Sequence, residues 1–189
     1  ETGDSDQIYV TGSGSDNILF ESFENEFPPS GWTIISNNSN NSVTQSDSRA
    51  HSGNYAARFS SYWTADSGDY TQYIITPQVY IPINGATFSM FYITNWTFWT
   101  GLSPESFMIG VSTSGADTAN FIWSDEFVVS EGEWNEYIEE LSTYAGQSVH
   151  VAIKYTSIYL QNLHIDDIQI SPGGAGPQPV ITLSHEEIP

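Results

Sequence analysis

The sequence predicts an all-β fold, an antiparallel β-sandwich of jelly-roll type. Short segments rich in aromatic and β-branched residues recur along the chain, for example TFSMFYIT (87–94) and SFMIGVST (106–113). Gly, Pro, Asn and Ser separate these segments and predict turns, as at PPSG (28–31) and NG (84–85). Many short strands between regular turns are typical of a sandwich.

The individual strands follow in chain order. An opening strand is expected within FESFEN (20–25), and the alternation of VHVAIKY (149–155) predicts a late strand with one buried face. The segment 124–141 could also be read as a helix. Its Gly132 and its branched and aromatic residues favour two strands and a turn. HIDDIQI (164–170) is expected to form the last strand of the sandwich. The whole fold is expected to have roughly ten to twelve short strands.

The chain has 189 residues, 39% of them hydrophobic, which is enough for one packed core and too little for two large domains. Four segments are expected: a flexible lead-in (1–17), the sandwich (18–171), a Pro/Gly linker (172–179) and the truncated start of a following domain (180–189). No apolar stretch reaches the roughly 18 residues of a membrane helix, and no signal peptide is visible. We therefore expect a monomeric unit within a multidomain chain, with no membrane insertion.

Acidic residues dominate the charge of the chain. The 23 acidic and three basic residues give a formal net charge of −20, which argues against binding to nucleic acid or anionic membranes. The acidic excess fits secretion and divalent cation binding, although solubility alone also explains it. The chain has no cysteine, which fits a bacterial surface protein held together without disulfides.

Motifs for catalysis are missing from the sequence. The absence of cysteine excludes thiol catalysis, and the four histidines lack the short spacing of zinc ligands. There is no G-x-S-x-G elbow and no phosphate-binding glycine loop. We therefore expect that the chain is not an enzyme.

Six segments resemble, in order, the landmarks of cleaved-adhesin or choice-of-anchor J domains, which occur in gingipain-type proteases and bacterial surface proteins. The same fold occurs in MAM domains and in jelly-roll carbohydrate-binding modules. The resemblance covers nearly all of 18–171 and implies the sandwich fold, whereas function depends on individual sites. The matching segments are FESFENEFPPSGWTI (20–34), DYTQYIITPQVYIP (69–82), ATFSMFYI (86–93), MIGVSTSGADTANF (108–121), WNEYIEELSTYAGQSVHVAIKY (134–155) and LHIDDIQI (163–170).

A structural calcium ion is the expected cofactor. In an unbroken strand Asp166 would share the core face of Ile168 and Ile170, and an inward carboxylate needs a cation or good hydrogen bonds. In jelly-roll carbohydrate-binding modules a calcium ion joins the first strand, a His-Ser-Gly-like turn and the last strand. By this resemblance Glu24 and Asp166 provide carboxylate ligands, with Asp167 and Glu21 as alternatives. The remaining ligands are the backbone carbonyls of Ser22, Ser52 and Tyr55.

Aromatic residues in predicted loops suggest a ligand-binding surface. Trp63, Trp96 and Trp99 are the expected ligand contacts, because loop aromatics can stack on sugar rings or anchor a protein partner. Closing the ends of the core is the alternative role for these residues. The other tryptophans, which lie in predicted strands, are expected in the core: Trp32, Trp123 and Trp134.

Three functions remain open at this point. The first is a non-catalytic adhesion or accessory module of a larger secreted or cell-surface bacterial protein, which binds glycan or a host or matrix protein. The second is a carbohydrate-binding module that targets an attached enzyme to polysaccharide. The third is a structural spacer stabilised by calcium. All three place the domain outside the cell.

Overall fold

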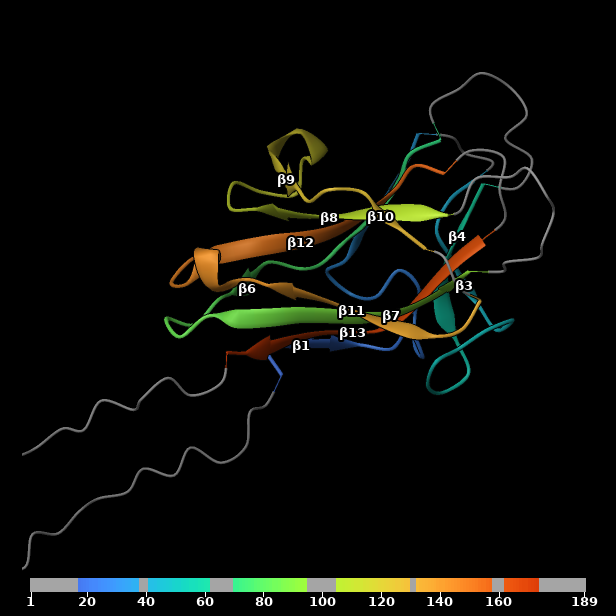
Figure 1. Ribbon diagram of the computed structural model, residues 1–189, viewed down its shortest axis with the longest axis horizontal. Coiled ribbons are helices and arrows are strands. Elements are labelled where there is room, and N and C mark those ends of the chain that lie inside the picture. The colour runs from blue at the N-terminus through green and yellow to red at the C-terminus, as the bar shows by residue number, and fades with distance from the viewer. Residues whose placement is uncertain are drawn as a thin grey trace, which may run out of the picture.

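A computed structural model describes residues 17–37, 41–61, 70–94, 105–129, 132–157 and 162–173. These residues form two antiparallel sheets packed face to face (Figure 1), which confirms the predicted β-sandwich. The predicted lead-in, the linker and the segment 180–189 lie almost wholly outside the described residues.

Sheet A holds the last strand of the fold at its centre. Its order is β11–β7–β13–β4–β3, and β1 also pairs with β13. The strands are β1 (Leu19–Glu21), β3 (Thr44–Ser46), β4 (Ala56–Ser60), β7 (Ala86–Thr94), β11 (Asn135–Glu140) and β13 (Asn162–Pro172).

Sheet B is built around β8 and β12. Its order is β10–β8–β12–β5–β2, with β6 paired to β12 and β9 paired to β8. The strands are β2 (Thr33–Ser36), β5 (Gln72–Ile75), β6 (Val79–Tyr80), β8 (Ser106–Ser112), β9 (Ile122–Trp123), β10 (Phe127–Val128) and β12 (Ser148–Tyr155). The segment 124–141 contains β10 and β11, as predicted.

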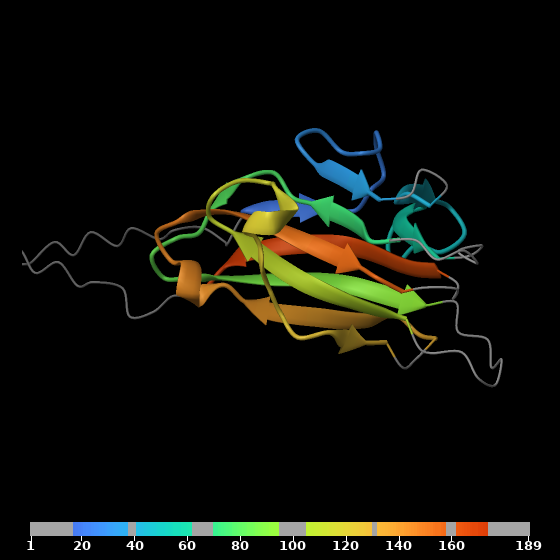
Figure 2. The ribbon, with the colours of Figure 1, turned by 90° about the horizontal axis from the view of Figure 1, so that it is seen from above.

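Helix is confined to two single 3-10 turns in the described residues, η1 (Thr118–Asn120) and η2 (Ser142–Tyr144). Figures 1 and 2 show η1 outside sheet B, on the side away from sheet A. No helix in this part of the chain is long and apolar enough to cross a membrane.

The core lies between the sheets. The predicted alternation of β12 is confirmed, because Val149, Val151, Ile153 and Tyr155 are fully buried and belong to the core. Trp32 also lies in the core, as expected. Trp123 is half-buried in β9 and packs against a second, smaller core cluster with Tyr73 and Ile75. The expectation for Trp134 is wrong, because it is half-buried and lies outside both clusters.

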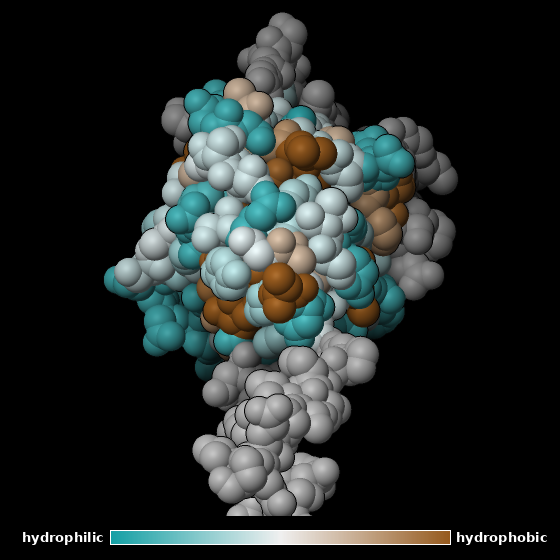
Figure 3. All heavy atoms as spheres, turned by 90° about the vertical axis from the view of Figure 1, so that its left-hand side faces the viewer, coloured by the Kyte–Doolittle hydropathy of each residue, from teal (hydrophilic) through white to brown (hydrophobic). Residues whose placement is uncertain are grey.

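The first and last described residues meet at one end of the sandwich. Ile18 donates its N–H to the carbonyl of Ile170 at 2.8 Å, and Gln169 bonds Asn17 at 2.9 Å. Figure 3 views the molecule from this side, where hydrophobic side chains form small separate patches among hydrophilic ones. The strand ends that border 62–69 and 95–104 lie at the opposite end of the sandwich (Figure 1).

Candidate metal and ligand site beside the 48–55 loop

A β-bulge in β13 determines where the predicted carboxylates lie. The pairing of β13 with β7 shifts between Asp166 and Gln169, and Asp167 has a φ of 46°. Leu163 and Ile165 therefore point into the core before the bulge, and Ile168 does so after it. The prediction that Asp166 shares the face of Ile168 is wrong, because the strand is broken between them.

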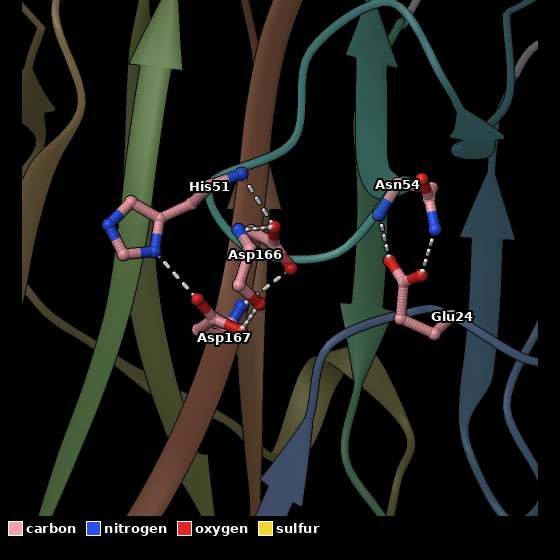
Figure 4. Close-up of polar contacts among 6 residues, drawn as sticks. Glu24, His51, Asn54, Asp166 and Asp167 are labelled. Atoms are coloured by element: carbon pink, nitrogen blue, oxygen red, sulfur yellow. Dashed lines mark hydrogen bonds and ion pairs between the residues drawn. The ribbon is translucent and has the colours of Figure 1, made fainter.

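Asp166 lies instead on the outer face of sheet A, the face turned away from sheet B. Its side chain is nevertheless fully buried, because the 48–55 loop passes over it. One carboxylate oxygen accepts the N–H groups of His51 at 2.8 Å and Ser52 at 3.1 Å, and the other accepts that of Asp167 at 2.8 Å (Figure 4). Two backbone N–H groups of the loop and one of β13 thus donate to this buried carboxylate.

Glu24 binds the other end of the same loop (Figure 4). Its Oε1 accepts the N–H groups of Asn54 at 2.9 Å and Tyr55 at 2.7 Å. Gly53, with a φ of +60°, leaves room for this carboxylate, since a Cβ there would lie 2.4 Å from Glu24 Cδ. The structure therefore brings Glu24, Asp166 and the predicted loop together.

Burial and hydrogen bonds shift the two carboxyl groups in opposite directions. Burial raises the pKa of Asp166 to about 6, although the N–H groups of Ser52, Asp167 and His51 oppose it. The N–H groups of Tyr55 and Asn54 lower the pKa of Glu24. The buried carboxylate is therefore the one whose negative charge lacks full compensation.

The donor set at this loop suits a hard cation only in part. Ser52 and Tyr55 meet the carboxylates through N–H groups, and the Ser22 N–H interacts with Glu21. Within the described ranges, no three His, Asp or Glu side chains are grouped so that they could hold a metal ion. A calcium ion here would need backbone carbonyl oxygens as well as the two carboxylates.

An aromatic stack borders the loop on the outer face of sheet A. The His51 ring stacks on Phe91 of β7 with centroids 3.6 Å apart and planes 10° apart, and Trp134 approaches it edge-on at 5.5 Å. His51 Nδ1 also lies 2.6 Å from a carboxylate oxygen of Asp167. The sequence does not predict this group, because residues far apart in the chain meet here and Trp134 is expected in the core.

The model of the Cleaved Adhesin Domain family matches residues 16–170. The chain belongs to this family. Hemagglutinin A of Porphyromonas gingivalis is 28% identical to it over 200 residues, which cover 90% of this chain and 7% of Hemagglutinin A. This cleaved adhesin domain therefore spans a small fraction of the length of its curated relative.

Solved structures share the sandwich fold of this cleaved adhesin domain. The K3 cleaved adhesin domain of Lys-gingipain from Porphyromonas gingivalis w83 has a TM-score of 0.68 and 23% identity, and the match covers 85% of this chain and 100% of that one. TmCBM61, solved in complex with beta-1,4-galactotriose, has a TM-score of 0.57 and 18% identity, with 82% and 98% covered. At these identities the likeness shows the fold alone.

The predicted ligand residues of this cleaved adhesin domain, Trp63, Trp96 and Trp99, lie outside the described residues. The chain on either side of them is described. The buried Tyr155 hydroxyl donates to the Glu105 carboxylate at 2.6 Å and contacts the Ser61 hydroxyl at 3.0 Å. Ser61 directly precedes 62–69 and Glu105 directly follows 95–104, so a described residue next to each tryptophan-bearing segment contacts the same hydroxyl group.

Proposed function

We propose that this cleaved adhesin domain is a non-catalytic adhesion module of a larger secreted or cell-surface bacterial protein. It binds glycan or a host or matrix protein through Trp63, Trp96 and Trp99. The contact of Tyr155 with Ser61 and Glu105 carries the proposal, because it brings together two described residues, one next to each tryptophan-bearing segment. This contact lies at the end of the sandwich opposite the first and last described residues, which suits presentation to a partner (Figure 1).

A second candidate is a carbohydrate-binding module that directs an attached enzyme to polysaccharide. It is favoured by the likeness of the fold to TmCBM61, whose structure contains beta-1,4-galactotriose. Both functions need a ligand surface of exposed rings, and they differ in the natural target.

The experiment compares the full chain with a variant in which Trp63, Trp96 and Trp99 are all alanine. Both are applied to a glycan array and to a pull-down from host matrix proteins. We expect at least a tenfold loss of attachment in the variant, at an unchanged melting temperature. If the full chain binds glycans and no matrix protein, the result favours the carbohydrate-binding module. If the full chain binds matrix proteins, the result favours adhesion to protein. Full attachment by the triple variant contradicts the proposed role of the tryptophans and leaves the spacer function.

We also propose a structural calcium ion between Glu24 and Asp166, completed by the carbonyl oxygens of Ser22, Ser52 and Tyr55. Two observations support it: both carboxylates reach the same loop, and the pKa of Asp166 stays raised despite its three N–H donors. Oxygen-only ligands match the preference of calcium. The ion would stabilise the fold by joining both ends of the described chain.

A further inference from the structure

We propose that His51, Phe91 and Trp134 form a binding surface for neutral sugar rings, here called the His51 platform. The inference rests on the proposed adhesion function and gives it a ligand class and a contact surface separate from Trp63, Trp96 and Trp99. The platform lies on the outer face of sheet A, over β7 and at the start of β11.

The His51 ring is held in one orientation before any ligand arrives. Its Nδ1 lies 2.6 Å from Asp167 Oδ2, and the other oxygen of Asp167 accepts the Ser52 hydroxyl at 2.6 Å. One face of the ring stacks on Phe91, and the His51 N–H is bonded to Asp166. Figure 4 shows the ring extending over β7, away from Glu24. A ring held by Asp167 and Phe91 loses little conformational entropy when it binds a ligand.

The hydrogen bonding of His51 leaves Nε2 for a ligand. A carboxylate only accepts, so Nδ1 carries a hydrogen, and Nε2 is left to make one further hydrogen bond. Nε2 has no hydrogen-bond partner among the described residues, and 30% of the side chain is exposed. A hydroxyl group, which both donates and accepts, can bond this nitrogen in either role.

Trp134 adds a second aromatic surface at a steep angle to the first. Its ring lies 5.5 Å from that of His51 with 68° between the planes, and the side chain is half-buried. Rigid aromatic rings with a few fixed polar groups are the usual lining of ligand sites. The C–H face of a pyranose ring can pack on either ring while its hydroxyl groups reach Nε2.

The surrounding charge decides which sugars fit. Glu136 is exposed directly opposite Phe91 in the pairing of β11 with β7, and the whole chain carries a net charge of −20. This field repels uronate and sulfated sugars, whereas carboxylates accept hydrogen bonds from neutral hydroxyl groups. The same field attracts lysine and arginine side chains, so a lysine-rich peptide is the competing ligand in the test.

The test uses the full chain and two variants that remove platform rings, Trp134→Ala and His51→Ala. The second keeps the backbone donor to Asp166. The control is Trp123→Ala, which removes a half-buried tryptophan from the outer face of the other sheet. Affinity electrophoresis with a neutral galactan, polygalacturonate and a lysine-rich peptide measures retardation, and melting temperatures report folding.

We expect the neutral galactan to bind about tenfold more weakly to Trp134→Ala and to His51→Ala, and equally to Trp123→Ala. The inference is overturned if both platform variants bind the galactan as well as the full chain does. It is also overturned if Trp134→Ala weakens binding of the lysine-rich peptide and not of the galactan. If the galactan binds and only the triple variant of Trp63, Trp96 and Trp99 loses it, the platform is wrong and the proposed function stands. If no galactan binds but matrix proteins do, the sugar platform fails and adhesion remains.

Discussion

At the scale of single residues, Gly53 allows the 48–55 loop to meet Glu24, which follows β1. Its φ of +60° is a conformation that glycine adopts without a side-chain clash, and the Glu24 carboxylate occupies the place of a Cβ. Glu24 in turn accepts the N–H groups of Asn54 and Tyr55. The missing side chain at one position therefore permits two hydrogen bonds.

The substitution Gly53→Ala is expected to destabilise the domain. The left-handed backbone costs an alanine about 1–2 kcal/mol, and the displaced Glu24 carboxylate loses its two backbone donors in addition. Gly146→Ala is the matched control, since Gly146 has a similar φ of +77° and a Cβ there would meet nothing within 4 Å. Urea unfolding should show the larger loss for Gly53→Ala; equal losses would mean that the contact with Glu24 adds nothing to stability.

At the scale of elements, β13 shows how far the sequence predicts this structure. Patterns of branched and aromatic residues predict β7, β8 and β12 close to their observed bounds, because burial of one face imposes a period of two. The bulge after Asp166 has no such signal in the sequence. With one inserted residue, the alternation in a segment as short as HIDDIQI is equally compatible with a regular strand. The family resemblance predicts that Glu24 and Asp166 lie beside the 48–55 loop, as they do. The stack of His51 on Phe91 depends on tertiary packing and has no signal in the sequence.

The buried Tyr155, the last residue of β12, leads us to expect a loss of folding stability at alkaline pH. Burial, and then the neighbouring Glu105 carboxylate, raise the pKa of Tyr155 well above its usual value of about 10. The unfolded chain releases this proton near pH 10 and the folded chain does not, so stability is complete below pH 10 and falls as the pH rises further.

Tyr155→Phe tests the cause of this alkaline effect. It should cost about 1–3 kcal/mol at pH 7, because the buried Glu105 loses the Tyr155 hydroxyl as a donor, and it should flatten the decline between pH 9 and pH 11. Tyr80→Phe, at a tyrosine that is 57% exposed, is the control. Urea midpoints across this range provide the measurement, and an unchanged decline in Tyr155→Phe would assign the effect to other groups, such as Tyr137.

At the scale of the whole molecule, a calcium ion at the 48–55 loop would act on the stability of the entire fold. At a hundredfold excess over its Kd, an ion that binds only the folded state adds about 2.7 kcal/mol. Chelation should then lower the melting temperature by about 5–10 °C, and added calcium should restore it.

Asp166→Asn is expected to abolish this calcium response, and Asp125→Asn, at an exposed acid, is expected to keep it. Differential scanning calorimetry with elemental analysis measures both the melt and the bound metal. A melt that chelator leaves unchanged, in protein free of metal, would show that the backbone hydrogen bonds of Asp166 and Glu24 hold the loop alone.

The antiparallel pairing of β1 with β13 also determines how the domain responds to pulling. Leu19 faces Ile170 and Glu21 faces Ile168, so tension applied between the first and last described residues loads these hydrogen bonds one after another. Such a ladder opens by peeling, which needs less force than sliding two strands past each other. Peeling that passes Glu21 next meets Glu24 and its bonds to the 48–55 loop. The hydrogen bonds between Glu24 and the loop are therefore the next contacts that this tension would load.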